Sequence, residues 1–82
     1  MNQKTNSDGV IAFLLILTSG DQTENVLNQL KKLAEVVEAY IIYGDWDLIV
    51  KVKIASLPEL TRMVMKLRKT EGVEKTSTLI TI

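Results

Sequence analysis

The sequence predicts an α+β domain whose six elements follow the order β-α-β-β-α-β. An unbroken apolar run is followed by a segment with helical periodicity, and the second half of the chain repeats this arrangement. Shifting the sequence so that Ser19 falls on Ser56 also aligns "LNQLKKLAEV" with "VMKLRKTEGV". Two tandem β-α-β halves give the ferredoxin-like arrangement, a four-stranded antiparallel sheet with two helices on one face. The length of 82 residues leaves room for one domain.

The first half of the chain contains a polar start, a strand and a helix. Residues 1–9 are expected to form a loose tail, and the domain is expected to span residues 10–82. The run from Val10 to Leu17 is apolar throughout, which is typical of a strand covered on both faces. Ser19 and Asp21 each have capping-box spacing, so the first helix is expected to begin near them. Its apolar stripe is predicted to comprise Val26, Leu27, Leu30, Leu33 and Ala34.

A β-branched and aromatic segment, "VVEAYIIYG", predicts a second strand that ends at Gly44. Simple alternation places two sets of its side chains on opposite faces. One set is Val37, Ala39, Ile41 and Tyr43, and the other is Val36, Tyr40 and Ile42.

The second half of the chain is predicted to contain a strand, a helix and a final strand. "LIVKVKI" alternates, with Leu48, Val50, Val52 and Ile54 on one face. "SLPEL" has the signature of a helix start, with Ser56 as the N-cap and Pro58 in the first turn. Gly72 ends that helix, and the β-rich "VEKTSTLITI" closes the chain with Thr76 and Thr78 on one face.

Composition excludes several classes of function. Histidine and cysteine are absent, which removes the commonest general base, metal ligand and thiol nucleophile. Ten basic and ten acidic residues cancel, so the chain lacks the charge of a nucleic-acid binder. The first apolar run is too short to span a bilayer and lacks the flanks of a secretory signal. We therefore expect a cytoplasmic protein without membrane association, enzymatic activity or a cofactor.

Two helices can cover only one face of the predicted sheet, whereas the first strand is apolar on both. An exposed apolar surface of this extent usually marks an interface. The simplest cover is the same face of a second copy, which gives a dimer that resembles an α+β barrel. The polar residues before the domain are too few to cover this face.

The turn "GDWD" allows two interpretations. In one, Gly44 supplies a positive φ, Asp45 caps the turn and Trp46 packs on a neighbouring subunit. In the other, backbone N–H groups near Gly44 hold a carboxylate, and Asp45 or Asp47 accepts a hydrogen bond from an ammonium group. Trp46 then forms the wall of a small pocket, as an α-amino acid requires. Both interpretations use the same residues.

The threonines of the last strand are similarly ambiguous. Thr76 and Thr78 are good strand formers on a half-solvated face, or they line a small polar pocket at an interface. Metal binding by the two aspartates and threonine hydroxyls would be unspecific. No nucleophile has a base nearby, and alternation points Asp45 and Asp47 to opposite sides.

Taken together, "VVEAYIIYGDWDLIVKVKI", a helix and "TEGVEKTSTLITI" resemble the C-terminal effector-binding domain of the Lrp/AsnC (feast/famine) transcription regulators. The resemblance covers nearly all of residues 10–82. It implies dimers formed by sheet packing that join into larger closed assemblies, with small effectors, commonly amino acids, bound between dimers. Carried onto this sequence, it implies a lining of Gly44, Asp45, Trp46, Asp47, Thr76 and Thr78.

The regulators of this family carry an N-terminal helix-turn-helix domain, whereas only a short polar segment precedes the first strand in this sequence. The resemblance therefore indicates a stand-alone module that modulates transcription by co-assembling with full-length relatives and does not bind DNA directly. One alternative is a purely structural assembly partner without a ligand. Another is a dimeric α+β-barrel enzyme, which the absence of histidine disfavours.

Overall fold

The computed structural model describes residues 9–82. Of the expected N-terminal tail, only Gly9 lies within the described residues. The elements follow the predicted order β-α-β-β-α-β. Their bounds are β1 Val10–Thr18, α1 Thr23–Lys31, β2 Val36–Ile41, β3 Leu48–Ile54, α2 Leu57–Arg68 and β4 Val73–Ile80.

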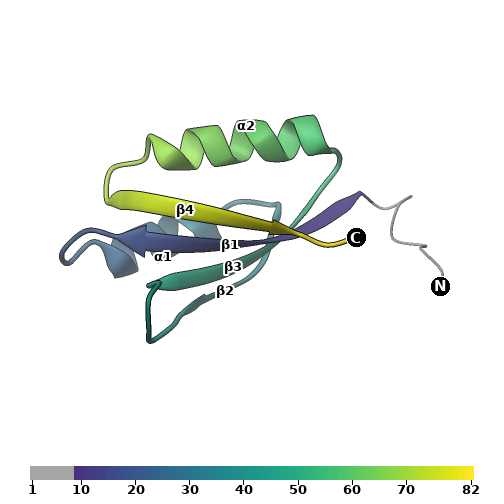
Figure 1. The fold of residues 1–82 in the computed structure, drawn as a ribbon. Coiled ribbons are helices and arrows are strands. Elements are labelled where there is room, and N and C mark those ends of the chain that lie inside the picture. Colours follow the sequence, from purple (N-terminus) through teal and green to yellow (C-terminus); the bar gives the residue numbers. More distant parts are fainter. Residues whose placement is uncertain (1–8) are drawn as a thin grey trace.

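The strands form one antiparallel sheet in the order β2-β3-β1-β4 (Figure 1). The two strands that begin the two halves of the chain, β1 and β3, are central, as a pair of β-α-β units requires. α1 packs mainly against β2, and α2 runs along β4. The predicted ferredoxin-like fold is confirmed.

The core lies between the sheet and the two helices. Along β1, buried residues alternate with half-buried ones, and β3 buries all four residues of its predicted apolar face. α1 contributes Val26 and Leu30 to the core, and α2 contributes Leu60 and Leu67. The fully buried side chains of the sheet are Ala12, Leu14, Ile16, Leu48, Val50 and Val52.

The second face of the sheet, which we call the open face, carries no helix. The strand register places a continuous apolar set there, with charged neighbours from β2, β3 and β4. The apolar set comprises Ile11, Phe13, Leu15, Leu17, Tyr40, Ile49 and Leu79. Tyr40 and Leu79 are 55% and 52% exposed, so within one chain this surface is in contact with solvent.

The first helix differs from its prediction. α1 begins at Thr23 after Gln22, whose side chain makes no capping hydrogen bond, so neither Ser19 nor Asp21 is the N-cap. The helix also ends early, at Lys31, and Leu33 lies beyond it with 41% exposure. The residues that the repeat assigned to the first turn of the helix form a separate turn, in which Gly20 adopts a φ of +52°.

The second helix agrees with its prediction. The Ser56 hydroxyl accepts a hydrogen bond from the Glu59 backbone N–H at 3.4 Å, and Pro58 lies in the first turn. Gly72 follows the helix with a φ of +95°. A Cβ at this position would lie only 2.8 Å from the Cβ of Gln22, so Gly72 also allows the loop before β4 to approach the start of α1.

The second strand contains a bulge that simple alternation misses. Val36 pairs with Val52 and Glu38 with Lys51, which leaves Val37 as the extra residue. Val36 therefore shares the helix-covered face with Ala39 and Ile41, contrary to the prediction, because one inserted residue reverses the alternation before it. The predicted grouping of Val37 with Ala39 is wrong for the same reason.

Candidate functional site

The predicted turn connects β2 to β3 as a six-residue loop, residues 42–47. The Ile42 backbone N–H donates to the Asp47 carbonyl at 2.9 Å and closes the loop. β2 ends at Ile41, where the last ladder pair is Ile41 and Leu48, and not at Gly44 as predicted. The prediction was too long because the β-branched sequence pattern continues past this pair. Tyr43 is fully exposed, and Gly44 has the positive φ that was predicted, +141°.

Asp47 is bound to the body of the domain. Its carboxylate Oδ2 accepts a hydrogen bond from the Thr18 backbone N–H at 2.8 Å and lies 3.0 Å from the Thr18 hydroxyl, which also donates to it. Thr18 is only 7% exposed, and its hydroxyl lies 2.6 Å from that of Thr23 at the start of α1. The carboxylate that was predicted to accept a hydrogen bond from an ammonium group is therefore already hydrogen-bonded to Thr18 within the domain.

Trp46, the residue before Asp47, is half-buried. The Lys75 ammonium is 5.9 Å from the centre of its ring, within reach of a cation–π interaction. Lys75 pairs with Leu17 of β1, so it belongs to the open face. Trp46 is thus placed at the border of the apolar open face, where an aromatic side chain is available to a second molecule.

Thr76 and Thr78 face the opposite side of the sheet. They pair with Ile16 and Leu14, whose side chains lie under the helices. There they line a hollow of about 450 Å³ between β4 and α2. Its full lining is Val64, Arg68, Val73, Glu74, Lys75, Thr76 and Thr78.

Arg68 and Glu74 extend the predicted set of polar residues. Both line the hollow beside the threonine hydroxyls, so a cation and an anion frame it. Arg68 also lies in the last turn of α2, where a basic side chain complements the helix dipole. Its spacing of four from Val64, which faces β4, is the signal that would have placed it beside the threonines.

Within one chain, the turn and the threonines do not form a single pocket. Asp47 donates its backbone N–H to the Ile16 carbonyl on one side of β1, and Thr76 pairs with Ile16 on the other side. The lining of the hollow includes none of residues 44–47. The six predicted residues therefore lie at the same end of the sheet but flank β1 from both edges.

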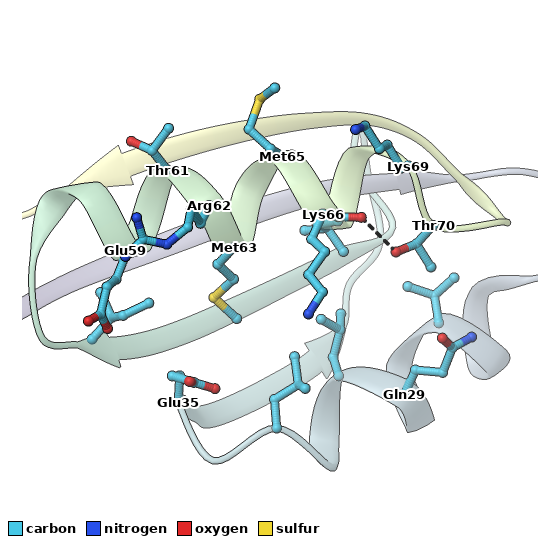
Figure 2. A pocket seen from close by; sticks show the side chains of 15 residues that line it. Gln29, Glu35, Glu59, Thr61, Arg62, Met63, Met65, Lys66, Lys69 and Thr70 are labelled. Atoms are coloured by element: carbon cyan, nitrogen blue, oxygen red, sulfur yellow. Dashed lines mark hydrogen bonds between the residues drawn. The ribbon is translucent and has the colours of Figure 1, made fainter.

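A larger groove of about 890 Å³ lies between α1 and α2 and contains none of the predicted site residues. Figure 2 shows Met63 and Lys66 extending from α2 toward α1, whereas Thr61 and Met65 point away. The floor of this groove is the outer surface of the core, including Leu30. Its polar groups are spread along the rim and do not converge on one point.

The described residues also bear on metal binding and membranes. No group of three or more histidine, cysteine, aspartate or glutamate side chains in residues 9–82 is arranged to hold a metal ion. Neither helix of this part of the chain is long and apolar enough to cross a bilayer. The polar groups that do converge, at the turn and at the β4 hollow, are suited to hydrogen bonding and ion pairing.

Curated relatives of this chain are transcriptional regulators. It is 39% identical to an uncharacterized helix-turn-helix-type transcriptional regulator of Pyrococcus abyssi over 96% of the chain and 55% of the relative. It is 32% identical to the helix-turn-helix-type transcriptional regulator FL11 of Pyrococcus furiosus over 100% of the chain and 54% of the relative. The chain thus spans about half the length of the curated relatives it matches.

Solved structures show the same fold. FFRP-DM1 is 40% identical with a TM-score of 0.87, over 89% of this chain and 99% of that one. Escherichia coli AsnC is 26% identical with a TM-score of 0.86, over 100% of this chain and 56% of that one. A transcriptional regulator of Neisseria meningitidis, solved as its L-Met complex, shares the fold at 16% identity, with a TM-score of 0.84, over 100% of this chain and 55% of that one.

The family model of the Lrp/AsnC ligand-binding domain matches residues 11–82, which include every strand and helix apart from the first residue of β1. This match covers the turn, the β4 hollow and the open face. The curated relatives named above are helix-turn-helix-type transcriptional regulators. The chain therefore belongs to the Lrp/AsnC ligand-binding domain family.

Proposed function

We propose that this chain is a cytoplasmic, self-assembling sensor of a small effector, most simply an amino acid. It modulates transcription by co-assembling with full-length Lrp/AsnC regulators and does not itself contact DNA. The family match supports ligand binding in transcriptional regulation. The balanced charge of the chain supports an indirect route to DNA.

Self-assembly is supported by the open face. Packing this face against the same face of a second copy would remove the apolar side chains of β1 from water. At about 25 cal/mol per Å², burial of a few hundred Å² would contribute several kcal/mol to the dimer. Glu38 and the lysines 51 and 53 lie on the same face, and they supply charges of both signs for contacts across a two-fold axis.

The observation that carries the effector proposal is the placement of complementary groups on the two sides of β1. Arg68 and the threonine hydroxyls at the β4 hollow can bind a carboxylate, and the exposed Asp45 can bind an ammonium group. Trp46 offers an apolar wall. Because these groups do not meet within one chain, we propose that a second subunit completes the site, with larger closed assemblies bringing the turn of one dimer against another.

Isothermal titration calorimetry with each of the twenty amino acids tests this function, on the wild type and on Asp45→Asn and Arg68→Gln. We expect at least one amino acid to bind to the wild type. Each substitution should lower the affinity for that amino acid by about tenfold or more, since a hydrogen bond to a charged group contributes about 1.5–3 kcal/mol. Arg62→Gln, on the same helix but lining the other groove, is the matched control and should bind as the wild type does.

Two further outcomes separate this proposal from its alternatives. A chain that assembles but binds none of the twenty amino acids would be a purely structural assembly partner. Native mass spectrometry of the chain mixed with a full-length relative should reveal mixed assemblies, and a gel shift with the chain alone should be negative. A sequence-specific shift would contradict the indirect route.

A further inference from the structure

Asp47 has three of its polar groups engaged within the chain. Its backbone N–H donates to the Ile16 carbonyl at 2.9 Å, and its own carbonyl accepts from the Ile42 N–H at 2.9 Å. Its carboxylate accepts two hydrogen bonds from Thr18 through the single oxygen Oδ2. One residue thus links the end of β2, the end of β1 and the start of β3.

The link continues into the first helix. The Thr18 hydroxyl donates to Asp47 while lying 2.6 Å from the hydroxyl of Thr23, the first residue of α1. α1 has no side-chain capping bond from Gln22. Donation by the Thr23 hydroxyl to that of Thr18 leaves the Thr18 proton for Asp47, so the three residues form one ordered chain of hydrogen bonds.

We infer that Asp47 is a positioning residue that fixes the turn of residues 44–46 to the β1–α1 junction. Its two bonds to Thr18 set where Trp46 lies relative to Lys75 and where α1 begins. A consequence, which rests on the proposed function, is that Asp45 and not Asp47 is the turn carboxylate that meets the ammonium group of an effector. Asp45 is exposed and has no hydrogen bond among the described residues that would compete with this role.

The two aspartates have distinct environments despite lying two residues apart. Asp47 faces Thr18, a residue with almost no contact with solvent, and Oδ2 already accepts two donors. An effector at Asp47 would have to use the remaining oxygen or break these bonds. Breaking them would leave the buried Thr18 N–H without a partner, which proteins rarely tolerate.

The inference is tested without any ligand. Asp47→Ala removes the acceptor, and Asp45→Ala makes the identical chemical change two residues away. Hydrogen exchange of the Thr18 amide and acrylamide quenching of Trp46 are measured in both. We expect Asp47→Ala to accelerate Thr18 exchange by about tenfold or more and to alter the quenching constant of Trp46, because a hydrogen bond to a charged group is lost. Asp45→Ala should match the wild type.

A second pair of variants keeps the test decisive if Asp47→Ala does not fold. Thr18→Val removes the hydroxyl but keeps the side-chain shape, and Thr18→Ser keeps the hydroxyl. Only Thr18→Val should change Trp46 quenching. Equal Thr18 exchange and Trp46 quenching in Asp47→Ala and Asp45→Ala, or equal quenching in Thr18→Val and the wild type, would overturn the positioning role.

The assignment of the two aspartates has its own readout. In titrations with the twenty amino acids, Asp45→Ala should weaken binding while leaving Trp46 quenching of the free protein unchanged. Asp47→Ala should change both together. If no amino acid binds the wild type, the proposed function fails, whereas the exchange and quenching measurements still decide whether Asp47 positions the turn.

Discussion

Thr18 and Asp47 are joined by two hydrogen bonds that converge on one carboxylate oxygen, at 2.8 Å from the Thr18 nitrogen and 3.0 Å from its hydroxyl oxygen. The two residues are 29 positions apart in the sequence. Their contact connects the β2–β3 turn with the strand that precedes α1.

Asp47→Ala should lower the free energy of unfolding by about 1–3 kcal/mol, because it leaves the buried Thr18 N–H unsatisfied. Urea denaturation followed by circular dichroism measures this change. Asp45→Ala, on the exposed part of the same turn, should change the free energy by no more than about 0.5 kcal/mol. Equal effects of the two substitutions would contradict a special role for Asp47.

Gly44→Asn should destabilise the domain by about 1–3 kcal/mol through backbone strain alone. The φ of Gly44 is +141°, although no atom lies within 4 Å of the position a Cβ would occupy. Gly20 provides a comparison, since its surroundings are equally open but its φ of +52° lies in the left-handed helical region. Thermal unfolding should therefore show a smaller loss for Gly20→Asn than for Gly44→Asn; the reverse order would contradict the strain argument.

Tyr40 should ionise at a higher pH than an ordinary tyrosine. Its hydroxyl donates to the Glu38 carboxylate at 2.8 Å, and this bond, followed by the Glu38 charge and desolvation, raises the pKa of Tyr40 above 10.0. Because the folded-state pKa is raised, the stabilisation is present below about pH 10 and is lost as the pH rises through the folded-state pKa.

Ultraviolet absorbance titration of a Tyr43→Phe variant isolates the signal of Tyr40, since the chain contains only two tyrosines. Adding Glu38→Gln should lower the pKa of Tyr40 toward 10.0, whereas Glu35→Gln, outside the strand, should leave it in place. An unchanged pKa in the Glu38→Gln variant would show that the bond is not formed in solution.

Leu15→Glu should convert an assembled protein into monomers. Leu15 lies between Ile49 and Ser77 on the open face, and a carboxylate buried there in a sheet-to-sheet contact would have no partner. Sedimentation velocity compares this variant with Met65→Glu, which places the same charge on an exposed position of α2. Dissociation by both substitutions, or by neither, would argue against the open face as the interface.

The fold was predictable because its signals are local and repeated. The alternation of apolar and polar residues predicts β3 without ambiguity, and the capping pattern at Ser56 does the same for the start of α2. Because the two halves of the chain repeat each other, the prediction for one half supports that for the other. The start of α1 was not predictable in the same way, because Ser19 and Asp21 satisfy a capping pattern that the turn at Gly20 then overrides. The bulge at Val37 leaves no mark in the sequence, since the residues on either side are equally strand-forming.

The candidate site was predictable in its residue types but not in its grouping. The positive φ of Gly44 and the common face of Thr76 and Thr78 follow from turn chemistry and alternation. That Asp47 would meet Thr18 depends on the register between β1 and β3, which no local pattern specifies. The same long-range register separates the turn from the threonines by the width of β1.

The most direct test of a site completed between subunits is to titrate amino acids while following the emission of Trp46, the only tryptophan of the chain, in the wild type and in the Leu15→Glu variant. We expect a saturable change in emission for at least one amino acid in the assembled wild type. We expect the folded Leu15→Glu monomer to lose this response. An unchanged binding curve in that monomer would contradict a site completed between subunits, because all the binding groups would then have to lie within one chain.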